Sequence, residues 1–549
     1  MEAPSARALS FAVVAAACLL LLPGLGGTGL WAPDEPRYAQ VAEEMRAGEA
    51  GWRGLVVLHL NGVPYDQKPP LYFWAAALAG APLGRVTETA ARLPSALAGV
   101  ASIGLCLAFG AKLVGPRRAA LAAALLLTCQ EFAHLSRRVQ LDVVLTLFET
   151  GALYAFWRFD RAIGAPRRNL RLLHAALGLG VLVKGPVGFL VPLLVIATYL
   201  ALERRLREIL RLFSPGLLLL SLGPGLAWAA AAVALTPAGY FQGAIVKNLL
   251  GRFFRGTAHP RPPWYFVWNF PLLFLPWALL WPLVWPAARA RLAAGADPIR
   301  ARAWRFLLAW AAASFVFFSL SGGKRLLYLV PTAPAAALLT ADALAFHLAD
   351  RARVPRWLAR AAGAGAALLG VAGFLVALAG PRLPIAPLPR SLGFACLGIA
   401  GAATLGWRAA AERASPWGPI GVLVAAVVAT ELALFALLFP ALDAEKSPRF
   451  LAEAAASVTP PGGRIGIVGN EGLVGGIAYY GRRRVARLES PASIERFLAE
   501  GGRALVVKPS EVERVSAFGP VEEIARARRG RRALAVVTPQ GDRSAPAPP

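Results

Sequence analysis

The sequence predicts an α-helical integral membrane protein with a small soluble α/β domain near its C-terminal end. Three observations lead to this fold class. The chain of 549 residues is 57% hydrophobic and only 16% charged, which is unlike a soluble globular domain. Apolar runs of about 18 or more residues, each long enough to cross a bilayer, recur from residue 8 to about residue 440. Beyond residue 444 the sequence becomes soluble in character.

The apolar runs divide the first part of the chain into about thirteen expected transmembrane helices. Their expected ranges are 8–27, 92–112, 118–134, 140–158, 172–187, 188–203, 213–236, 264–287, 305–321, 326–346, 358–380, 392–408 and 416–440. The first run could be a cleaved signal peptide. No A-x-A-like site precedes the polar loop, so we interpret it as a retained span.

The formal net charge of +27 is concentrated in short gaps between these runs, for example Arg204 to Arg211. Cytoplasmic loops of membrane proteins carry such an excess of Lys and Arg. With the N-terminus in the cytoplasm, every basic gap falls on the cytoplasmic side. Nucleic-acid binding is disfavoured because no aromatic side chains interleave with the basic residues.

Two soluble parts are expected on the opposite side of the membrane. Loop 28–91 is partly amphipathic and suits short helices lying in the interface plane. Within an expected domain over 444–540, strand patterns at 464–469, 483–488 and 503–509 alternate with helix patterns near 472–480 and over 493–502. We assign 1–443 to the membrane domain and expect the tail 541–549 to be disordered.

The outer ends of the expected spans hold an unusual set of charges. The carboxylates are Asp34, Glu35 and Asp142, and the cations are Lys68, Lys184, Arg252, Lys324 and Arg325. Charged groups at membrane depth are costly, so each needs a partner or a task. Cations can hold a lipid-borne phosphate. Carboxylates beside them suit general-base catalysis or stabilisation of a cationic sugar centre.

Each of these residues also has a structural alternative. Asp34 and Glu35 could favour the dipole of a helix that begins at Pro36. Asp142 could cap a helix or pair with Arg137 or Arg138. Lys184 could reach the head groups, and Lys324 with Arg325 could anchor the chain at the interface.

Cysteine and histidine do not predict a metal site. Cys18, Cys106, Cys129 and Cys396 lie in apolar runs without CxxC spacing, which is typical of small buried side chains. No His ligand spacing or DxD metal motif is present. We therefore expect neither a metal nor another cofactor.

Six segments together resemble a membrane-embedded, lipid-linked-sugar glycosyltransferase of the GT-C class. They are DEPRYAQVAEEM (34–45), NGVPYDQKPPLYFW (61–74), ARLPSALAG (91–99), RRVQLDVVL (137–145), KGPVG (184–188) and SGGKRLLYLVP (321–331). Their order and spacing are similar to those of the bacterial aminoarabinose transferase and protein mannosyltransferase-like group. The first two segments are the most specific.

The resemblance implies roles for particular residues. It places Asp34, Glu35 and Asp142 in the active-site cavity as the catalytic group. It assigns binding of the donor and its lipid phosphate to the following residues: Arg37, Tyr38, Tyr65, Lys68, Lys184, Arg252, Lys324, Arg325 and Tyr328. Residue 67 is Gln where aminoarabinose transferases often carry an acid, and this favours metal-independent chemistry.

The function implied is inverting transfer of a sugar from a polyprenyl-phosphate donor to a periplasmic acceptor. The sugar and acceptor could be 4-amino-4-deoxy-L-arabinose and lipid A, or a hexose such as mannose and a protein or another glycan. A transporter or flippase for a lipid-linked sugar is the rival from another class. A multi-pass protein of the bacterial inner membrane, with its active site and C-terminal domain facing the periplasm, is expected.

Overall fold

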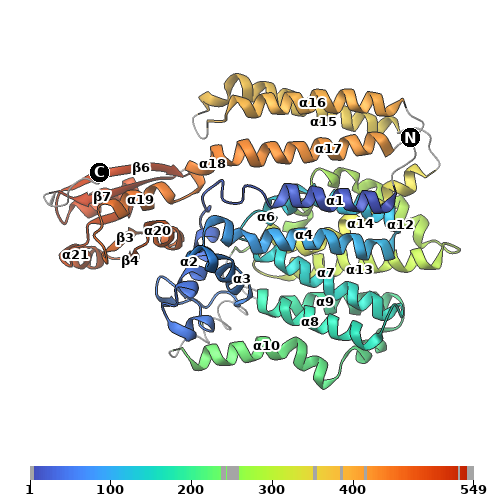
Figure 1. Cartoon of the computed structure of the whole chain (residues 1–549), viewed down its shortest axis with the longest axis horizontal. Coiled ribbons are helices and arrows are strands. Elements are labelled where there is room, and N and C mark those ends of the chain that lie inside the picture. The colour runs from blue at the N-terminus through green and yellow to red at the C-terminus, as the bar shows by residue number, and fades with distance from the viewer. Residues whose placement is uncertain are drawn as a thin grey trace.

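The computed structural model describes residues 5–236, 243, 259–349, 355–383, 387–412, 417–529 and 532–540. A bundle of long helices carries a small sheet domain at one end (Figure 1). The first helix begins at the end of the bundle away from that domain. Loop 28–91 and the C-terminal domain lie at the same end, as the sequence predicts.

The bundle consists of helices from all of the expected spans. The α-helices are α1 (Ala6–Leu21), α4 (Glu88–Leu113), α5 (Pro116–Leu127), α6 (Gln130–Ser136), α7 (Leu141–Asp160), α8 (Pro166–Lys184), α9 (Val187–Leu202), α10 (Pro215–Ala234), α11 (Tyr265–Leu273), α12 (Val284–Leu292), α13 (Pro298–Leu320), α14 (Ala333–Leu348), α15 (Arg356–Ala379), α16 (Arg390–Ala411), α17 (Trp417–Ala433) and α18 (Phe439–Lys446). Shorter 3₁₀ or π turns between them are η3 (Leu206–Leu212), η5 (Trp277–Leu283), η6 (Leu326–Thr332), η7 (Gly380–Arg382) and η8 (Leu434–Leu438).

Within the described ranges, seven helical segments are long and apolar enough to cross a membrane, or up to nine if each bent pair counts as one span. The expected spans 118–134 and 264–287 are each divided into two helical segments by a sharp bend. α5 and α6 meet at 69°, because the backbone of Cys129 is extended between them. α11 and the segment η5–α12 meet at 113°, where Pro271, Pro276 and Pro282 interrupt the helical hydrogen bonds.

Loop 28–91 folds into two helices joined by a hairpin. Its elements are α2 (Asp34–Ala47), η1 (Gly51–Leu55), β1 (His59–Leu60), β2 (Val63–Pro64), α3 (Leu71–Gly80) and η2 (Ala81–Leu83). α2 has Asp34 and Glu35 in its first turn and Arg46 in its last, which complements the helix dipole. It ends at Gly48, whose φ of 69° suits a left-handed cap.

The C-terminal domain is a five-stranded mixed sheet with helices. Its elements are α19 (Arg449–Ser457), β3 (Arg464–Val468), η9 (Glu471–Leu473), α20 (Val474–Gly481), β4 (Arg484–Leu488), α21 (Pro491–Ala499), β5 (Ala504–Val507), η10 (Pro509–Glu511), α22 (Val512–Ser516), β6 (Val521–Arg529) and β7 (Arg532–Pro539). The strand order is β4-β3-β5-β7-β6, with β3 parallel to β4 and β5 and with β7 antiparallel to β5 and β6. The expected α/β domain is therefore present. The tail 541–549 lies outside the described residues.

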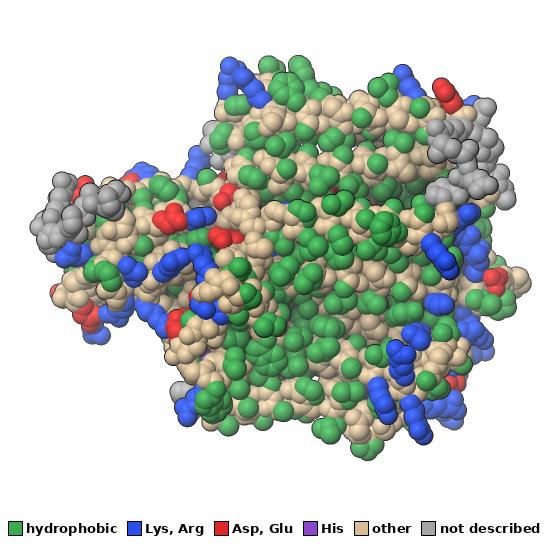
Figure 2. All heavy atoms as spheres, in the orientation of Figure 1, with side chains coloured by type: hydrophobic (Ala, Val, Ile, Leu, Met, Phe, Trp, Pro, Cys, Tyr) green, Lys and Arg blue, Asp and Glu red, His purple; other side chains and the backbone are tan. Residues whose placement is uncertain are grey.

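The surface divides along the axis of the bundle (Figure 2). Hydrophobic side chains cover the sides of the long helices, and Lys and Arg gather at the end away from the C-terminal domain. α15, α16 and α17 pack on one another in a separate layer beside α1. The charges of the candidate site lie at the other end of the bundle, where α2 packs against α3 and α4.

Candidate functional site

The carboxylate of Asp34, in the first loop, pairs with an arginine that lies nearly three hundred residues further along the chain. Its Oδ2 accepts a hydrogen bond of 3.0 Å from Nη1 of Arg325, and its Oδ1 lies 3.5 Å from Nη1 of Arg37. Arg325 immediately precedes η6, while Asp34 begins α2. The Asp34 side chain is 23% exposed, so the carboxylate borders open space rather than the protein core.

Asp142 forms a second ion pair beside it. The residue lies in the first turn of α7 and pairs with the ammonium of Lys184, the last residue of α8. The same ammonium lies 4.4 Å from the ring centroid of Tyr328, which is within the range of a cation–π contact. Asp142 is thus paired with Lys184, and the alternative pairing with Arg137 or Arg138 is wrong.

The two ion pairs belong to one cluster. Burial disfavours the charged form of Arg325, yet its pKa is raised because Asp34 and Asp142 both lie close enough to stabilise the cation. α7 packs against α8, which ends at Lys184, and against η6, which directly follows Arg325. Four segments far apart in sequence therefore bring two carboxylates, two cations and Tyr328 together. We call Asp34, Arg325, Asp142, Lys184 and Tyr328 the paired cluster.

Two tyrosines border the paired cluster. Tyr38 of α2 and Tyr65 both pack edge-on against Phe73 of α3, with ring centroids at 5.7 and 6.2 Å. Burial raises the pKa of Tyr38 well above its usual value, and the neighbouring Tyr65 and Asp34 raise it further. Tyr38 is therefore a neutral hydroxyl beside Asp34.

The other predicted cations occupy different positions. Lys68 is half-buried in the segment that leads into α3. The ammonium of Lys324 donates to the backbone carbonyls of Ser321 and, at 3.1 Å, Arg261, so it fastens residues 259–261 to the link before η6. Arg252 lies outside the described residues.

Glu35 lies in a buried network rather than in the paired cluster. Its carboxylate accepts hydrogen bonds from Arg92 at 2.9 and 3.0 Å, from Arg138 at 2.7 Å, and from the backbone N–H groups of Trp31 and Val139. Burial alone would raise the pKa of Glu35, but the two arginines outweigh it and hold the pKa at about 2. We call Glu35, Arg92 and Arg138 the Glu35 network.

The Glu35 network fixes the start of the first loop. Arg92 also donates to the carbonyls of Leu25, Thr28 and Gly29. The guanidinium of Arg138 stacks on Trp31 at 3.3 Å from the ring centroid. Because Asp34 directly precedes Glu35, this network sets where the Asp34 carboxylate lies.

The sequence interpretation missed the roles of Arg92, Arg138 and Glu149. Arg92 and Arg138 stand in motifs that carry the family resemblance, but only their structure shows that they share Glu35. Glu149 lies about two turns after Asp142 on α7 and is buried, with no hydrogen-bond partner for its Oε1 among the described residues. A carboxylate inside the apolar run LDVVLTLFET is the signal that could have identified it.

Comparison with known proteins gives a consistent result. Residues 67–228 match the model of the dolichyl-phosphate-mannose-protein mannosyltransferase family. The chain is 35% identical over 341 residues to an undecaprenyl phosphate-alpha-4-amino-4-deoxy-L-arabinose arabinosyl transferase of Pseudomonas savastanoi, covering 61% of each protein. It is 30% identical over 321 residues to the transferase of that name from Edwardsiella ictaluri, covering 57% of this chain and 56% of the relative. The chain thus matches about three fifths of the length of these curated relatives.

The structural likeness extends over almost the whole chain. The crystal structure of ArnT from Cupriavidus metallidurans bound to undecaprenyl phosphate matches with a TM-score of 0.75 at 23% identity, covering 97% of this chain and 98% of that one. The apo structure of the same protein matches with a TM-score of 0.72. The chain is therefore a multi-pass membrane protein with the GT-C fold, and the predicted fold class is confirmed. The predicted resemblance is also confirmed, since the chain is similar to the aminoarabinose transferases within that fold.

Proposed function

We propose that the chain is a glycosyltransferase that moves a sugar from a polyprenyl-phosphate donor to an acceptor by a single inverting displacement. The paired cluster is the observation that carries this proposal, because it joins carboxylates and cations at one end of a membrane bundle. Cations can hold the phosphate of a polyprenyl-phosphate donor, and carboxylates suit general-base catalysis or stabilisation of a cationic sugar centre. The relatives named above and the family model that matches residues 67–228 support the same reaction class.

In the proposed reaction, an acceptor oxygen forms a bond to the anomeric carbon while the bond from that carbon to the phosphate oxygen breaks. The polyprenyl phosphate leaves with the bonding electron pair. Its developing charge would be stabilised by Lys68, Arg252 and Lys184. Lys324 would contribute by fastening residues 259–261 beside the site, and Arg325 by orienting Asp34.

The role of the carboxylates depends on the acceptor. A hydroxyl acceptor has a proton to lose, and Asp34 would accept it while Asp142 orients the attacking group. A phosphate acceptor is already ionised and needs no base, so Asp34 would then position the nucleophile or recognise an amino sugar. A rate that falls as acid protonates the base would favour general-base catalysis, whereas a flat pH profile would exclude it.

For the substrates, we propose 4-amino-4-deoxy-L-arabinose as the sugar and lipid A as the acceptor, because the curated relatives carry aminoarabinose in their names. A mannose or another hexose moved to a protein or glycan is the second candidate. The match of residues 67–228 to a mannosyltransferase family favours it. We propose the bacterial inner membrane as its location, with the paired cluster and the C-terminal domain facing the periplasm.

The first test reconstitutes the protein in liposomes with undecaprenyl-phosphate sugars and follows release of undecaprenyl phosphate. We expect release that depends on an added acceptor, and its loss in Asp34→Asn and Lys68→Ala. Matched controls are Asp297→Asn, which keeps a helix-capping side chain, and Lys112→Ala at the exposed end of α4. Donor that crosses the bilayer without being cleaved would overturn the proposal in favour of a flippase.

A further inference from the structure

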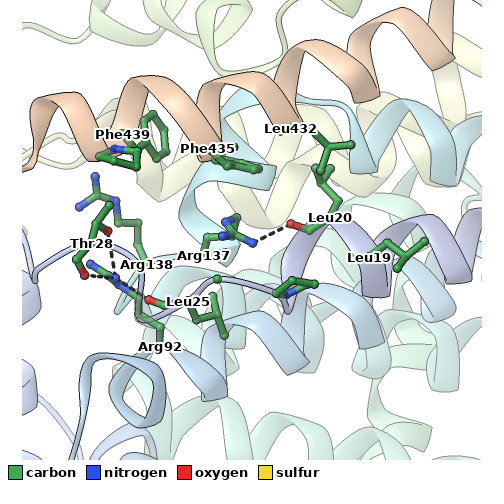
Figure 3. Close-up of a pocket in the computed structure, with 15 residues that line it drawn as sticks. Leu19, Leu20, Leu25, Thr28, Arg92, Arg137, Arg138, Leu432, Phe435 and Phe439 are labelled. Atoms are coloured by element: carbon green, nitrogen blue, oxygen red, sulfur yellow. Dashed lines mark hydrogen bonds between the residues drawn. The ribbon is translucent and has the colours of Figure 1, made fainter. Parts of the chain in front are cut away.

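A cavity separate from the paired cluster lies between α1 and the last membrane helix. It measures about 320 Å³ and is lined by the end of α1, residues 23–28, three arginines and one face of α17, η8 and α18 (Figure 3). None of its lining residues belongs to the paired cluster. The arginines are Arg92, Arg137 and Arg138, which all approach the cavity from one side.

Among the residues that the structure describes, the charge of Arg137 has no carboxylate partner. Its Nη1 donates to the carbonyl of Leu20 at 2.8 Å, and its guanidinium lies 4.6 Å from the ring centroid of Phe435. In the described ranges, no carboxylate lies within 4.0 Å of Arg137. A partly buried guanidinium in an apolar setting is costly unless an anion pairs with it.

The carboxylates near this cavity act on the other two arginines. Arg92 and Arg138 share the carboxylate of Glu35. Glu88 also interacts electrostatically with Arg92, and Glu131 and Asp443 with Arg138. Arg137 is therefore the guanidinium of this cavity with which a further anion would pair.

The walls of the cavity indicate that this anion carries hydrocarbon. Leu19 and Leu432 line it and are 70% and 46% exposed, so the apolar wall continues onto the outer surface of the bundle. α1 contacts α17 only sparsely, which leaves the cleft between these helices open to the bilayer. The arginines lie beside the last residues of α1 and the start of the first loop (Figure 3).

We infer that this cavity binds an anionic phospholipid of the surrounding bilayer, with its phosphate on Arg137 and Arg138 and an acyl chain between α1 and α17. The guanidinium of Arg137 lines the cavity and makes one hydrogen bond within the described residues, to the carbonyl of Leu20, and Arg–phosphate hydrogen bonds are among the strongest in proteins. The bound lipid would contact Arg92 and Arg138 and so brace the Glu35 network. It is not a substrate, and the inference stands whether or not the proposed function is correct.

The test measures thermal unfolding of the purified full chain in detergent with added dioleoylphosphatidylglycerol or dioleoylphosphatidylcholine. We expect the anionic lipid to raise Tm in the native chain and the zwitterionic lipid to have little effect. Arg137→Gln should weaken the response to phosphatidylglycerol by roughly tenfold in lipid concentration, as the loss of a charged hydrogen bond predicts. Arg207→Gln, an exposed arginine at the other end of the bundle, is the matched control and should respond like the native chain.

A second variant tests the cavity itself without changing any charged residue. Ala436→Trp places a large side chain in the mouth of the cavity on the exposed side of η8. We expect it to fold and to lose the response to phosphatidylglycerol. An equal response to both lipids, the same stabilisation by inorganic phosphate alone, or a native response in Arg137→Gln and Ala436→Trp would overturn the inference. Stabilisation by lipid A but not by phosphatidylglycerol would also overturn it, since the cavity would then be an acceptor site.

Discussion

Asp34 and Glu35 are neighbours in the chain, but they have different surroundings. Successive side chains on a helix point about 100° apart, so the first turn of α2 directs one carboxylate to Arg325 and the other into the protein. The side chain of Asp34 is partly exposed, while Glu35 is enclosed by two arginines and two backbone N–H groups. We therefore propose that Asp34 meets the substrate and that Glu35 is a positioning residue.

This assignment predicts the behaviour of Glu35→Gln. The variant leaves Arg92 and Arg138 without a countercharge, and breaking a buried ion pair in this way costs about 3–5 kcal/mol. We expect a clearly lower Tm at pH 7. Glu453→Gln, which removes an exposed partner of Arg449, should change Tm very little.

The pH dependence follows from the lowered pKa of Glu35. Its folded-state pKa of about 2 lies below the usual 4.5, so ionised Glu35 contributes stability that is fully present above about pH 4.5. That contribution is lost as the pH falls towards 2. The Tm difference between the native chain and Glu35→Gln should therefore stay constant from pH 7 to pH 5 and shrink at pH 3. A difference of the same size at pH 3 would contradict the ion-pair assignment.

Asp142 and Lys184 give a second prediction at this scale. Asp142→Asn should lower donor cleavage by roughly 100-fold or more, as expected for loss of a group that orients reactants or stabilises charge. It should also lower Tm, because Lys184 loses its buried partner. The double variant Asp142→Leu with Lys184→Met should recover much of the Tm but none of the activity. Recovery of activity in the double variant would mean that the pair is only structural.

At the scale of elements, the tight α8–α9 turn depends on small residues. Gly185 has φ of 72° after Lys184, and a Cβ atom added to Gly188 would overlap the backbone of Gly180. The two helices therefore touch through backbone atoms directly behind the paired cluster. The KGPVG motif is thus required by the close approach of the helices as well as by the position of Lys184.

Gly188→Ala should accordingly destabilise the chain. Forcing an extra carbon into a tight contact costs about 1–3 kcal/mol, and the shift of α8 should also lower activity. Gly398→Ala is the control, because nothing lies within 4 Å of the added atom in the middle of α16. That control should be neutral or slightly stabilising, since Ala favours helix over Gly by about 1 kcal/mol. Thermal unfolding and donor cleavage would be measured for both variants. Equal Tm values for Gly188→Ala and Gly398→Ala would contradict the predicted contact.

The sequence predicted the helices and strands better than it predicted which charged side chains pair with one another. Apolar runs and the basic gaps between them placed the helices, and alternation placed β3, β4 and β5, because these patterns are local. The bends after α5 and α11 and the β6–β7 hairpin were missed. Charged residues such as Arg526 and Arg528 hide the strand pattern of β6. The pairs of Asp34 with Arg325 and of Asp142 with Lys184 depend on packing between distant segments, which no local pattern reports.

On the scale of the whole molecule, the C-terminal domain is attached to the first loop as well as to α18. The hydroxyl of Tyr480 accepts a hydrogen bond from Leu30, and the hydroxyl of Tyr479 donates one to the carbonyl of Val86. A Cβ atom added to Gly475 would press against the backbone of Arg37 in α2. The domain therefore holds the loop that carries Asp34 from the side away from the helix bundle.

The Asn61–Gly62 turn of the first loop is a further attachment point. Both residues have positive φ, which suits a tight hairpin turn, and Glu44 accepts hydrogen bonds from both backbone N–H groups. The Asn61 side chain pairs with β4, donating to the carbonyl of Val485 and accepting from its N–H, each at 2.8 Å. One amide side chain thus joins the loop to the edge strand of the domain.

Asn61→Gly should loosen this attachment without straining the turn. Glycine accepts the same backbone conformation, while the loss of two hydrogen bonds costs about 1–3 kcal/mol. We expect faster amide hydrogen exchange in β4 and in residues 59–64, and a lower rate of donor cleavage because the α2 loop is held less firmly. The control Ser516→Ala removes an exposed hydroxyl of the same domain that bonds only within α22. It should change neither the amide exchange nor the rate of donor cleavage. Faster exchange in β4 with unchanged cleavage would show that the domain stabilises the fold without holding Asp34 in place.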